Sequence, residues 1–329
     1  MATVIVTGAS GHLGANLVRA LLARGEAVRV LIHHDTRALA GLPVQHFRGD
    51  VCDPDSLLSA FAGADIVYHA AGRISLRKRD APQLQAVNVE GVRNVLSAFR
   101  ASGAHRLIHF SSIHALQQKP LHLPVTEDRP LVLGGGEAYD RSKAAGERLV
   151  REAMTEGLDA CILYPTGIIG PHDYHPSHMG AVLLTTARGG MPALVRGGFD
   201  WVDARDVAAG AMAAAEHAPS GSRYLLSGHW VSIAELARMV ESLMGRRRRR
   251  MVVPIGLARL AAHWMEVWPE PRGRRAVFTP ASLAALRGNP SISHVKAARE
   301  LGYCPRPIVD TVRDTLQWFT QFGMLLADG

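Results

Sequence analysis

The stretch that most constrains how this chain can fold is TVIVTGASGHLGANLVRALLARG, which begins at Thr3. Its first residues, Thr3 to Val6, are β-branched and largely apolar, which suits a strand buried on both faces of a parallel sheet. Apolar side chains then recur at intervals of three and four within Ala15–Ala23, which predicts a helix with one buried face. The sequence therefore predicts a strand, a glycine turn and a helix.

The turn between this strand and this helix has the spacing Gly-x-x-Gly-x-x-Gly. Unpaired N–H groups and the positive end of the helix dipole face such a turn, so it suits an anion. Tight packing of the helix on the strand would also select glycine, but the strand and helix context favours phosphate binding. We expect a nucleotide phosphate to be held by residues of this turn, namely Gly8, Ser10, Gly11, His12, Leu13 and Gly14.

Strands and helices alternate through the first half of the chain. The predicted strands after the first are Ala27–Ile32, Val44–Phe47, Ile66–His69, Leu107–Phe110 and Ala160–Tyr164. The predicted helices between or after them are Pro54–Ala62, Asn88–Ser102 and Tyr139–Glu156. Strands separated by helices of this length pair in parallel through right-handed crossovers, which predicts an α/β fold with a doubly wound parallel sheet. Ligands bind at the carboxyl ends of the strands in such sheets.

The texture changes after Pro165, where proline, glycine and histidine become frequent. We expect residues 1–164 and 198–226 to form the nucleotide-binding domain. Residues 165–197 and 227–329, which include a proline-rich stretch near Pro254 and Pro269, should form a smaller mixed α/β lobe. The substrate would then meet the nucleotide between the two lobes.

The net charge of the 329-residue chain is +8, and much of the excess lies in Arg246–Arg250 and in Arg272, Arg274 and Arg275. No aromatic residues interleave these arginines, so we predict a solvated loop rather than a nucleic-acid site, with polyanion binding as the less favoured alternative. The three cysteines are scattered and suggest a reducing compartment. With no signal peptide or membrane span in view, we expect a soluble cytoplasmic protein.

Two short segments carry residues suited to catalysis. Tyr139 and Lys143 are four apart in a predicted helix, so the phenol and the ammonium group share a face, and a nearby cation favours the phenolate. A tyrosine whose pKa is lowered toward neutrality can exchange a proton with an alcohol oxygen. An ordinary exposed Tyr–Lys pair is the alternative. Ser111 and Ser112 follow a buried strand, where a hydroxyl can bind a substrate carbonyl or simply cap a turn.

Taken together, these segments resemble the extended short-chain dehydrogenase/reductases, also described as the NAD-dependent epimerase/dehydratase superfamily. The similarity runs through TGASGHLG, GDVCDPDSL, YHAAG, NVEGVRNVL, FSS, YDRSK, PTGIIGPHD, WVDARDVAAG and ARELGYCPRP. Within that superfamily the chain is most similar to dihydroflavonol-reductase-like and hopanoid-associated sugar epimerase-like members. The resemblance implies a Rossmann fold, a nicotinamide coenzyme and a small-molecule substrate.

The resemblance also implies a role for each matching residue. Tyr139 would be the catalytic acid–base, Lys143 would lower its pKa and hold the nicotinamide ribose, Ser112 would orient the substrate oxygen, and Asn88 would support Lys143 and a relay water. Asp50 and Val51 would contact the adenine, while Ala70 and Ala71 would line the path of the coenzyme. Pro165, Gly167 and Ile168 would approach the nicotinamide.

The choice between NAD and NADP depends on the end of the second strand. An acid there binds the ribose 2′-hydroxyl of NAD, and a cation binds the 2′-phosphate of NADP. The segment reads Ile32-His33-His34-Asp35-Thr36-Arg37, so that His33 and Arg37 could hold a phosphate and Asp35 a hydroxyl. We favour NADP and keep NAD as the alternative.

The function expected from these features is hydride transfer between NAD(P) and a carbonyl or secondary alcohol. A nucleotide-sugar epimerase is the alternative within the same scaffold, and a catalytically silent dinucleotide sensor is the alternative of another class. We predict no metal, because Pro171 and Pro176 interrupt the spacing of His172, His175 and His178. By resemblance, helices Asn88–Ser102 and Tyr139–Glu156 would form a homodimer interface.

Overall fold

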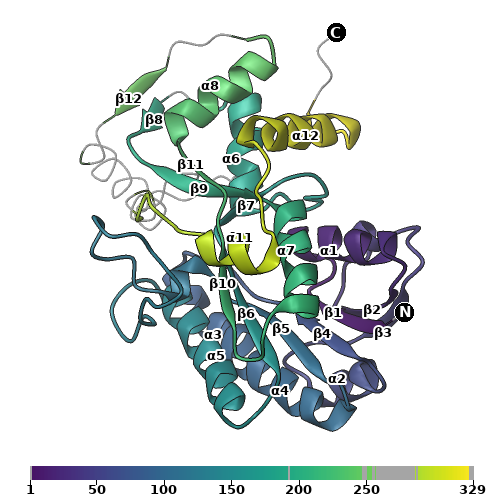
Figure 1. Ribbon diagram of the computed structural model, residues 1–329. Coiled ribbons are helices and arrows are strands. Elements are labelled where there is room, and N and C mark those ends of the chain that lie inside the picture. Colours follow the sequence, from purple (N-terminus) through teal and green to yellow (C-terminus); the bar gives the residue numbers. More distant parts are fainter. Residues whose placement is uncertain are drawn as a thin grey trace.

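The computed structural model describes residues 2–191, 193–246, 250–253 and 288–325, with the single residues Gly256 and Leu286. Its centre is a seven-stranded parallel sheet of order β10-β6-β5-β4-β1-β2-β3 (Figure 1). These strands are β1 (Thr3–Thr7), β2 (Ala27–Ile32), β3 (Gln45–Arg48), β4 (Ile66–His69), β5 (Arg106–Phe110), β6 (Ala160–Pro165) and β10 (Arg223–Leu226). The strand order reverses between β1 and β4, which confirms the doubly wound sheet.

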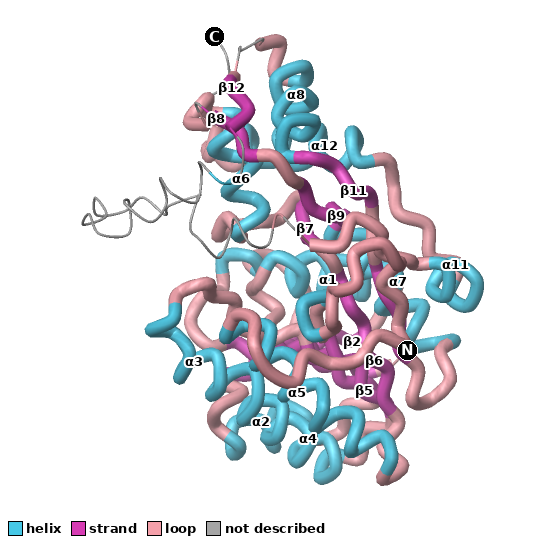
Figure 2. Tube along the Cα trace, turned by 90° about the vertical axis from the view of Figure 1, so that its left-hand side faces the viewer, coloured by secondary structure: helices cyan, strands magenta, loops and turns pink. Residues whose placement is uncertain are grey.

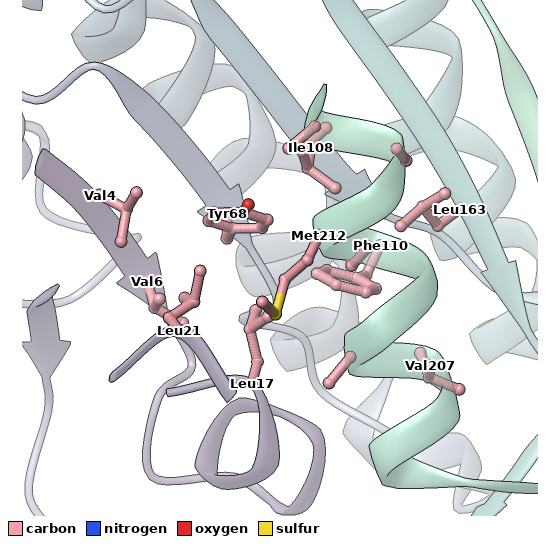
Figure 3. Packing of buried hydrophobic residues seen from close by; sticks show 14 of the residues in the cluster. Val4, Val6, Leu17, Leu21, Tyr68, Ile108, Phe110, Leu163, Val207 and Met212 are labelled. Carbon is pink, nitrogen blue, oxygen red and sulfur yellow. The ribbon is translucent and has the colours of Figure 1, made fainter. Parts of the chain in front are cut away.

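Helices cover both faces of this sheet. On one face, α1 (His12–Ala23) and α7 (Ala204–His217) bury Leu17, Val207 and Met212 against Tyr68 and Phe110 (Figure 3). The helices on the other face are α2 (Pro54–Phe61), α4 (Gly91–Ser102) and α5 (Ala138–Thr155). The predicted strands and helices of the first half are confirmed, with ends that differ by up to three residues.

A second group of elements follows β6. Strands β7 (Gly167–Ile169), β9 (Gly198–Asp203) and β11 (His229–Ser232) form a three-stranded sheet, and β8 (Ala193–Val195) pairs with β12 (Met251–Val253). The helices here are α6 (His178–Ala187), α8 (Ile233–Leu243) and α12 (Ile308–Gln321). Their apolar faces surround the buried Trp201 and Phe319 and form a core separate from the two cores of the large sheet. Figure 2 shows this group at one end of the molecule.

Two shorter helices complete the described elements. Helix α3 (Ala81–Gln85) continues into a π-helical turn (Ala86–Glu90) before α4, and α11 (Val295–Leu301) packs against α7 and β10. The π-helical turn lies where the sequence predicted an uninterrupted helix from Asn88. None of the helices in the described part of the chain is long and apolar enough to span a bilayer.

Arg250, the last residue of the arginine run, does not match the solvated loop that the sequence predicted. The Arg250 side chain is buried, and its Nε lies 2.7 Å from Glu241 Oε1 on α8. A buried guanidinium needs such a carboxylate to offset its lost hydration, so the contact with Glu241 accounts for the burial of Arg250. Residues 247–249, the arginines from Arg272 to Arg275, and Pro254 and Pro269 lie outside the described residues.

Candidate active site

The glycine turn is shaped by contacts between backbone atoms. Gly8 has a φ of +71°, and a Cβ at Gly14 would lie 2.1 Å from the Gly8 carbonyl oxygen. Gly11 differs, because a Cβ there would meet only that same oxygen, at 3.2 Å. Gly8 is therefore required by its left-handed backbone and by the segment after β4, since a Cβ there would lie 2.6 Å from Ala71 N. Gly14 is required by the close packing of α1 on the turn, whereas the space beside Gly11 lies open to a ligand.

No side chain caps the start of α1, and its first turn holds no acidic residue. Its amide groups thus stay available to an anion, and no carboxylate opposes one. The His12 side chain contacts the segment after β7, where its Nε2 lies 3.1 Å from the carbonyl oxygens of Gly170 and Pro171. This turn fits the phosphate-binding prediction through its backbone.

The predicted site residues lie at the carboxyl ends of the strands or on the helices beside them. Most of them follow a strand: β1 (Gly8, Ser10, Gly11, His12, Leu13, Gly14), β2 (His33, Arg37), β3 (Asp50, Val51), β4 (Ala70, Ala71) and β5 (Ser112). Pro165 is the last residue of β6, and Gly167 and Ile168 lie in β7. Asn88 lies in the π-helical turn before α4, and Tyr139 and Lys143 lie in the first two turns of α5. The fold thus places the predicted site residues along one edge of the sheet, and their roles stay predictions.

Tyr139 and Lys143 are both buried on α5, beside the segment that follows β5. Burial raises the pKa of Tyr139 to about 12, although a hydrogen bond with the Ser112 side chain acts to lower it. Lys143 donates from Nζ to the Phe110 carbonyl oxygen at 2.8 Å, and burial lowers its pKa to about 8. Desolvation of the phenolate dominates in this arrangement, and the lowering of the Tyr139 pKa by Lys143 stays a prediction.

Asn88 connects the segment after β4 to α5. Its side chain accepts a hydrogen bond from the Arg73 N–H at 2.8 Å, and donates to the Arg73 carbonyl and to Ser142 Oγ, both at 2.9 Å. A Cβ on Gly72 would lie 3.5 Å from Asn88 Oδ1 and 3.9 Å from Lys143 Nζ. Asn88 and Lys143 therefore border the same space, and the predicted support of Lys143 by Asn88 stays a prediction.

Sequence reasoning missed a buried carboxylate one helical turn beyond Lys143. Glu147 is fully buried and accepts hydrogen bonds from Ser111 Oγ at 2.5 Å and Tyr164 Oη at 2.6 Å. Arg151 Nε donates to it at 2.8 Å. These contacts offset the cost of burying the charge. The signal was the four-residue repeat Tyr139, Lys143, Glu147, which places all three on one helix face.

A row of polar side chains crosses the large sheet beneath Lys143. Thr7, His69 and His109 are register neighbours on β1, β4 and β5, and Thr7 Oγ1 lies 2.8 Å from His69 Nδ1. Both rings are 1% exposed, and burial together with the Lys143 charge lowers the pKa of both, to about 3 for His69. The two imidazoles are therefore neutral and add no positive charge beside Lys143.

The end of β2 is organised by ion pairs. His33 Nε2 lies 3.2 Å from Asp50 Oδ2, which pairs a residue predicted for the 2′-phosphate with a residue predicted for the adenine. Arg37 binds both oxygens of Asp35, with its Nη2 3.1 Å from Oδ2, and the hydrogen bonds from Arg37 hold the pKa of Asp35 well below its usual range. The acid and the base that would select between NAD and NADP thus bind each other.

The three histidines after β7 have different surroundings. The His172 ring lies 6.0 Å from the Trp318 ring, His175 contacts Asp35 and Arg37, and His178 begins α6. No group of three or more His, Cys, Asp or Glu side chains in the described part of the chain is arranged to hold a metal.

Two of the predicted contact residues also have structural roles. The Val51 side chain is buried against Gly91, and its carbonyl accepts a hydrogen bond from Asn94 Nδ2 at 2.9 Å. A Cβ on Gly167 would lie 2.9 Å from the Asp200 carbonyl oxygen, so β7 packs closely on β9. The predicted contacts of Val51 and Gly167 with a coenzyme stay predictions.

A doubly wound sheet, an uncapped glycine turn and a buried tyrosine and lysine at the strand ends define a nucleotide-dependent oxidoreductase. The family model named NAD dependent epimerase/dehydratase family matches residues 4–227. The chain belongs to this family, within the extended short-chain dehydrogenase/reductases, and is an NAD(P)-dependent enzyme.

Individual relatives cover nearly the whole chain. Sterol demethylase protein B of Methylococcus capsulatus is 37% identical, with 98% of this chain and 100% of the relative covered. A ketoreductase of Stigmatella aurantiaca that acts on a 4-hydroxy-2-methyl-3-oxo-4-farnesyl-3,4-dihydroquinoline-1-oxide is 31% identical, with 92% and 91% covered. The crystal structure of gox2253 superposes with a TM-score of 0.85 at 32% identity and covers 99% of this chain and 100% of its own.

Proposed function

We propose that this enzyme reduces a carbonyl group to a secondary alcohol with NADPH, and that Tyr139 donates the proton. The observation that carries this proposal is the contact between the Tyr139 phenol and the Ser112 side chain, with Lys143 buried one turn along α5. All three lie at the carboxyl end of β5, on the sheet edge that also holds the glycine turn. The ketoreductase relative supports the same direction of reaction.

Reduction of a carbonyl requires Tyr139 in its protonated form. With a pKa of about 12 the phenol is protonated at neutral pH, which is the form that donates a proton to a carbonyl oxygen as negative charge develops on it. The Ser112 hydroxyl donates a second hydrogen bond to that oxygen. Lys143, with its pKa lowered to about 8, supplies a mobile proton beside Tyr139.

The coenzyme would be held by the backbone of the glycine turn at its pyrophosphate and by the residues after β2 and β3 at its adenosine. It supplies the hydride when bound. Arg37 favours NADP at the 2′-position, whereas Asp35 favours the hydroxyl of NAD. The Asp35 carboxylate would suit NAD, and it therefore keeps an NAD-dependent epimerase as the second candidate. Such an enzyme oxidises its substrate transiently and returns the hydride to it.

The decisive experiment compares Tyr139→Phe with a matched buried tyrosine. Tyr303 is 6% exposed against 8% for Tyr139, and its hydroxyl donates to the Ser227 carbonyl at 3.0 Å. A panel of hydrophobic ketones with NADPH would be followed by loss of nicotinamide absorbance. Tyr139→Phe should lower turnover by about 10²-fold or more while the coenzyme Kd changes less than about twofold. Tyr303→Phe should retain turnover, and equal activity in both variants would overturn the role of Tyr139.

A homodimer through α4 and α5 is part of the same proposal. A groove of about 260 Å³ lies between α3 and the outer face of α5, and it is bordered by Leu133, which is 76% exposed. A single exposed apolar side chain is ordinary on a protein surface, so the dimer is proposed from the family to which the chain belongs. Light scattering at micromolar concentration should give twice the mass of 35.5 kDa, and a stable monomer would contradict this part.

A further inference from the structure

One residue of the second group of elements reaches the adenosine end of the site. His175 lies in the loop between β7 and α6, 138 residues from Arg37 in sequence, and its Nδ1 is 3.1 Å from Arg37 Nη2. His175 Nε2 also contacts the Asp35 carboxylate. The side chains that face the 2′-position of a coenzyme therefore come from two distant segments.

Buried contacts fix the position of this loop. His12 and Asn16 on α1 bind the carbonyls of Gly170 and Pro171, with Asn16 Nδ2 2.9 Å from the Pro171 oxygen. Three residues further along α1, Arg19 donates from Nη2 to the Tyr174 hydroxyl at 2.9 Å. These partners form one face of the helix that starts at the glycine turn.

Two further restraints act on each side of His175. Asp173 is 1% exposed and accepts a hydrogen bond from the Ser177 N–H at 2.9 Å, which closes the loop at the start of α6. Pro176 follows His175 and restricts its backbone to extended conformations. The imidazole is 64% exposed, and these contacts of the loop backbone position it beside Arg37.

The charges at this end decide what the histidine can do. Asp35 neutralises Arg37 and repels a phosphate, so Arg37 alone offers a 2′-phosphate little net attraction. An imidazole that donates a hydrogen bond to the Asp35 carboxylate competes with Arg37 for it and so weakens the Asp35–Arg37 ion pair. Because Nδ1 faces a guanidinium nitrogen that can only donate, the ring donates from Nε2, and this N–H can pass from the Asp35 carboxylate to a phosphate oxygen.

We infer that His175 is a coenzyme-selecting residue. From the loop between β7 and α6, it binds the 2′-phosphate of NADP jointly with Arg37. This rests on the proposed use of a nicotinamide coenzyme. The same loop continues into α6, whose apolar face packs in the core around Trp201 and Phe319, so the group at the 2′-position would contact a segment that leads to that core.

The test uses fragments that carry only this end of the coenzyme. Calorimetry would measure Kd for adenosine 2′,5′-bisphosphate and for AMP with the whole protein and with His175→Ala, His175→Arg and Arg37→Ala. His217→Ala is the matched control, because His217 is 63% exposed and its Nε2 lies 3.5 Å from Glu216. NADPH and NADH would then be compared in the same variants.

His175→Ala should weaken the bisphosphate about fivefold and AMP less than about twofold, as expected for one exposed charged contact. His175→Arg should restore the bisphosphate affinity, and His217→Ala should change neither. Equal weakening of both fragments, or no change, would overturn the role of His175. If the unaltered protein binds neither NADPH nor NADH, the proposed function fails, whereas coenzyme binding without discrimination at His175 removes only this inference.

Discussion

The two ends of the site differ in how far their charged and polar side chains are buried. At the catalytic end, Tyr139, Lys143 and Glu147 are buried on one face of α5 and bonded to groups that are buried as well. At the adenosine end, the pairs of His33 with Asp50 and of Arg37 with Asp35 are largely exposed. A buried charge that loses its partner is strongly destabilising, whereas an exposed pair contributes little.

The difference separates what the fold needs from what the ligand needs. Changes at the buried end should alter the free energy of unfolding as well as chemistry. Changes at the exposed end should alter coenzyme affinity and leave the fold intact. Four experiments test this division through the same quantity, the free energy of unfolding.

The largest effect is expected at the turn between β1 and α1. Gly14→Ala would place a Cβ 2.1 Å from the Gly8 carbonyl oxygen and 2.7 Å from Ala9 Cα, so the strand and the helix must move apart. We expect a loss of about 4 kcal/mol in urea denaturation. Gly11→Ala is the control, because its contact is 3.2 Å. It should cost less than about 1 kcal/mol and weaken coenzyme binding instead. Similar losses in both variants would contradict this account of the turn.

The second effect concerns the carboxylate that sequence reasoning missed. Glu147→Leu leaves the hydroxyls of Ser111 and Tyr164 without their acceptor and Arg151 without its counterion, so we expect a loss of about 3 kcal/mol. Glu152→Leu, on an exposed position of the same helix, should change stability by less than about 0.5 kcal/mol. Equal values in urea denaturation would show that the buried network contributes nothing.

The sheet and the glycine turn could be predicted because they depend on local pattern. β-branched runs, helical spacing and glycine spacing are visible within a few residues, and the strand ends then bring the motif residues together. The pKa of Tyr139 could not be predicted, since neighbours along the helix do not report burial. Arg250 was wrongly assigned to solvent for the same reason: its partner Glu241 lies on a separate helix.

The third effect has the opposite sign. Burial lowers the pKa of Lys143 from 10.5 to about 8, so below pH 8 the folded protein carries a buried charge that costs about 3 kcal/mol. Lys143→Met removes this cost and loses one hydrogen bond, which predicts a gain of about 2 kcal/mol at pH 7. The unaltered protein loses that penalty between pH 8 and 10.5, because the folded state then binds fewer protons than the unfolded chain.

The gain from Lys143→Met should therefore vanish as the pH rises through this window. Urea denaturation at pH 7 and at pH 10 measures it, with Lys119→Met as the exposed control that should show no pH-dependent difference. A gain that is the same at both pH values would assign the effect to packing and not to the buried charge. Loss of activity in the stabilised variant would fit a catalytic residue that is kept at a cost in stability.

The smallest effect is expected at the adenosine end. The His33 and Asp50 side chains are 60% and 36% exposed, so a double-mutant cycle of His33→Ala and Asp50→Asn should give a coupling below about 0.5 kcal/mol in unfolding. Asp50→Asn should weaken AMP binding several-fold, because Asp50 is predicted to contact the adenine, whereas His33→Ala should weaken adenosine 2′,5′-bisphosphate more than AMP, because His33 is predicted to hold the 2′-phosphate. A coupling above about 1.5 kcal/mol would show that this pair stabilises the fold as a buried pair does, and would contradict the comparison. Side chains that contribute so little to folding can change without loss of the fold, and for this reason the sequence pattern could not decide between NAD and NADP.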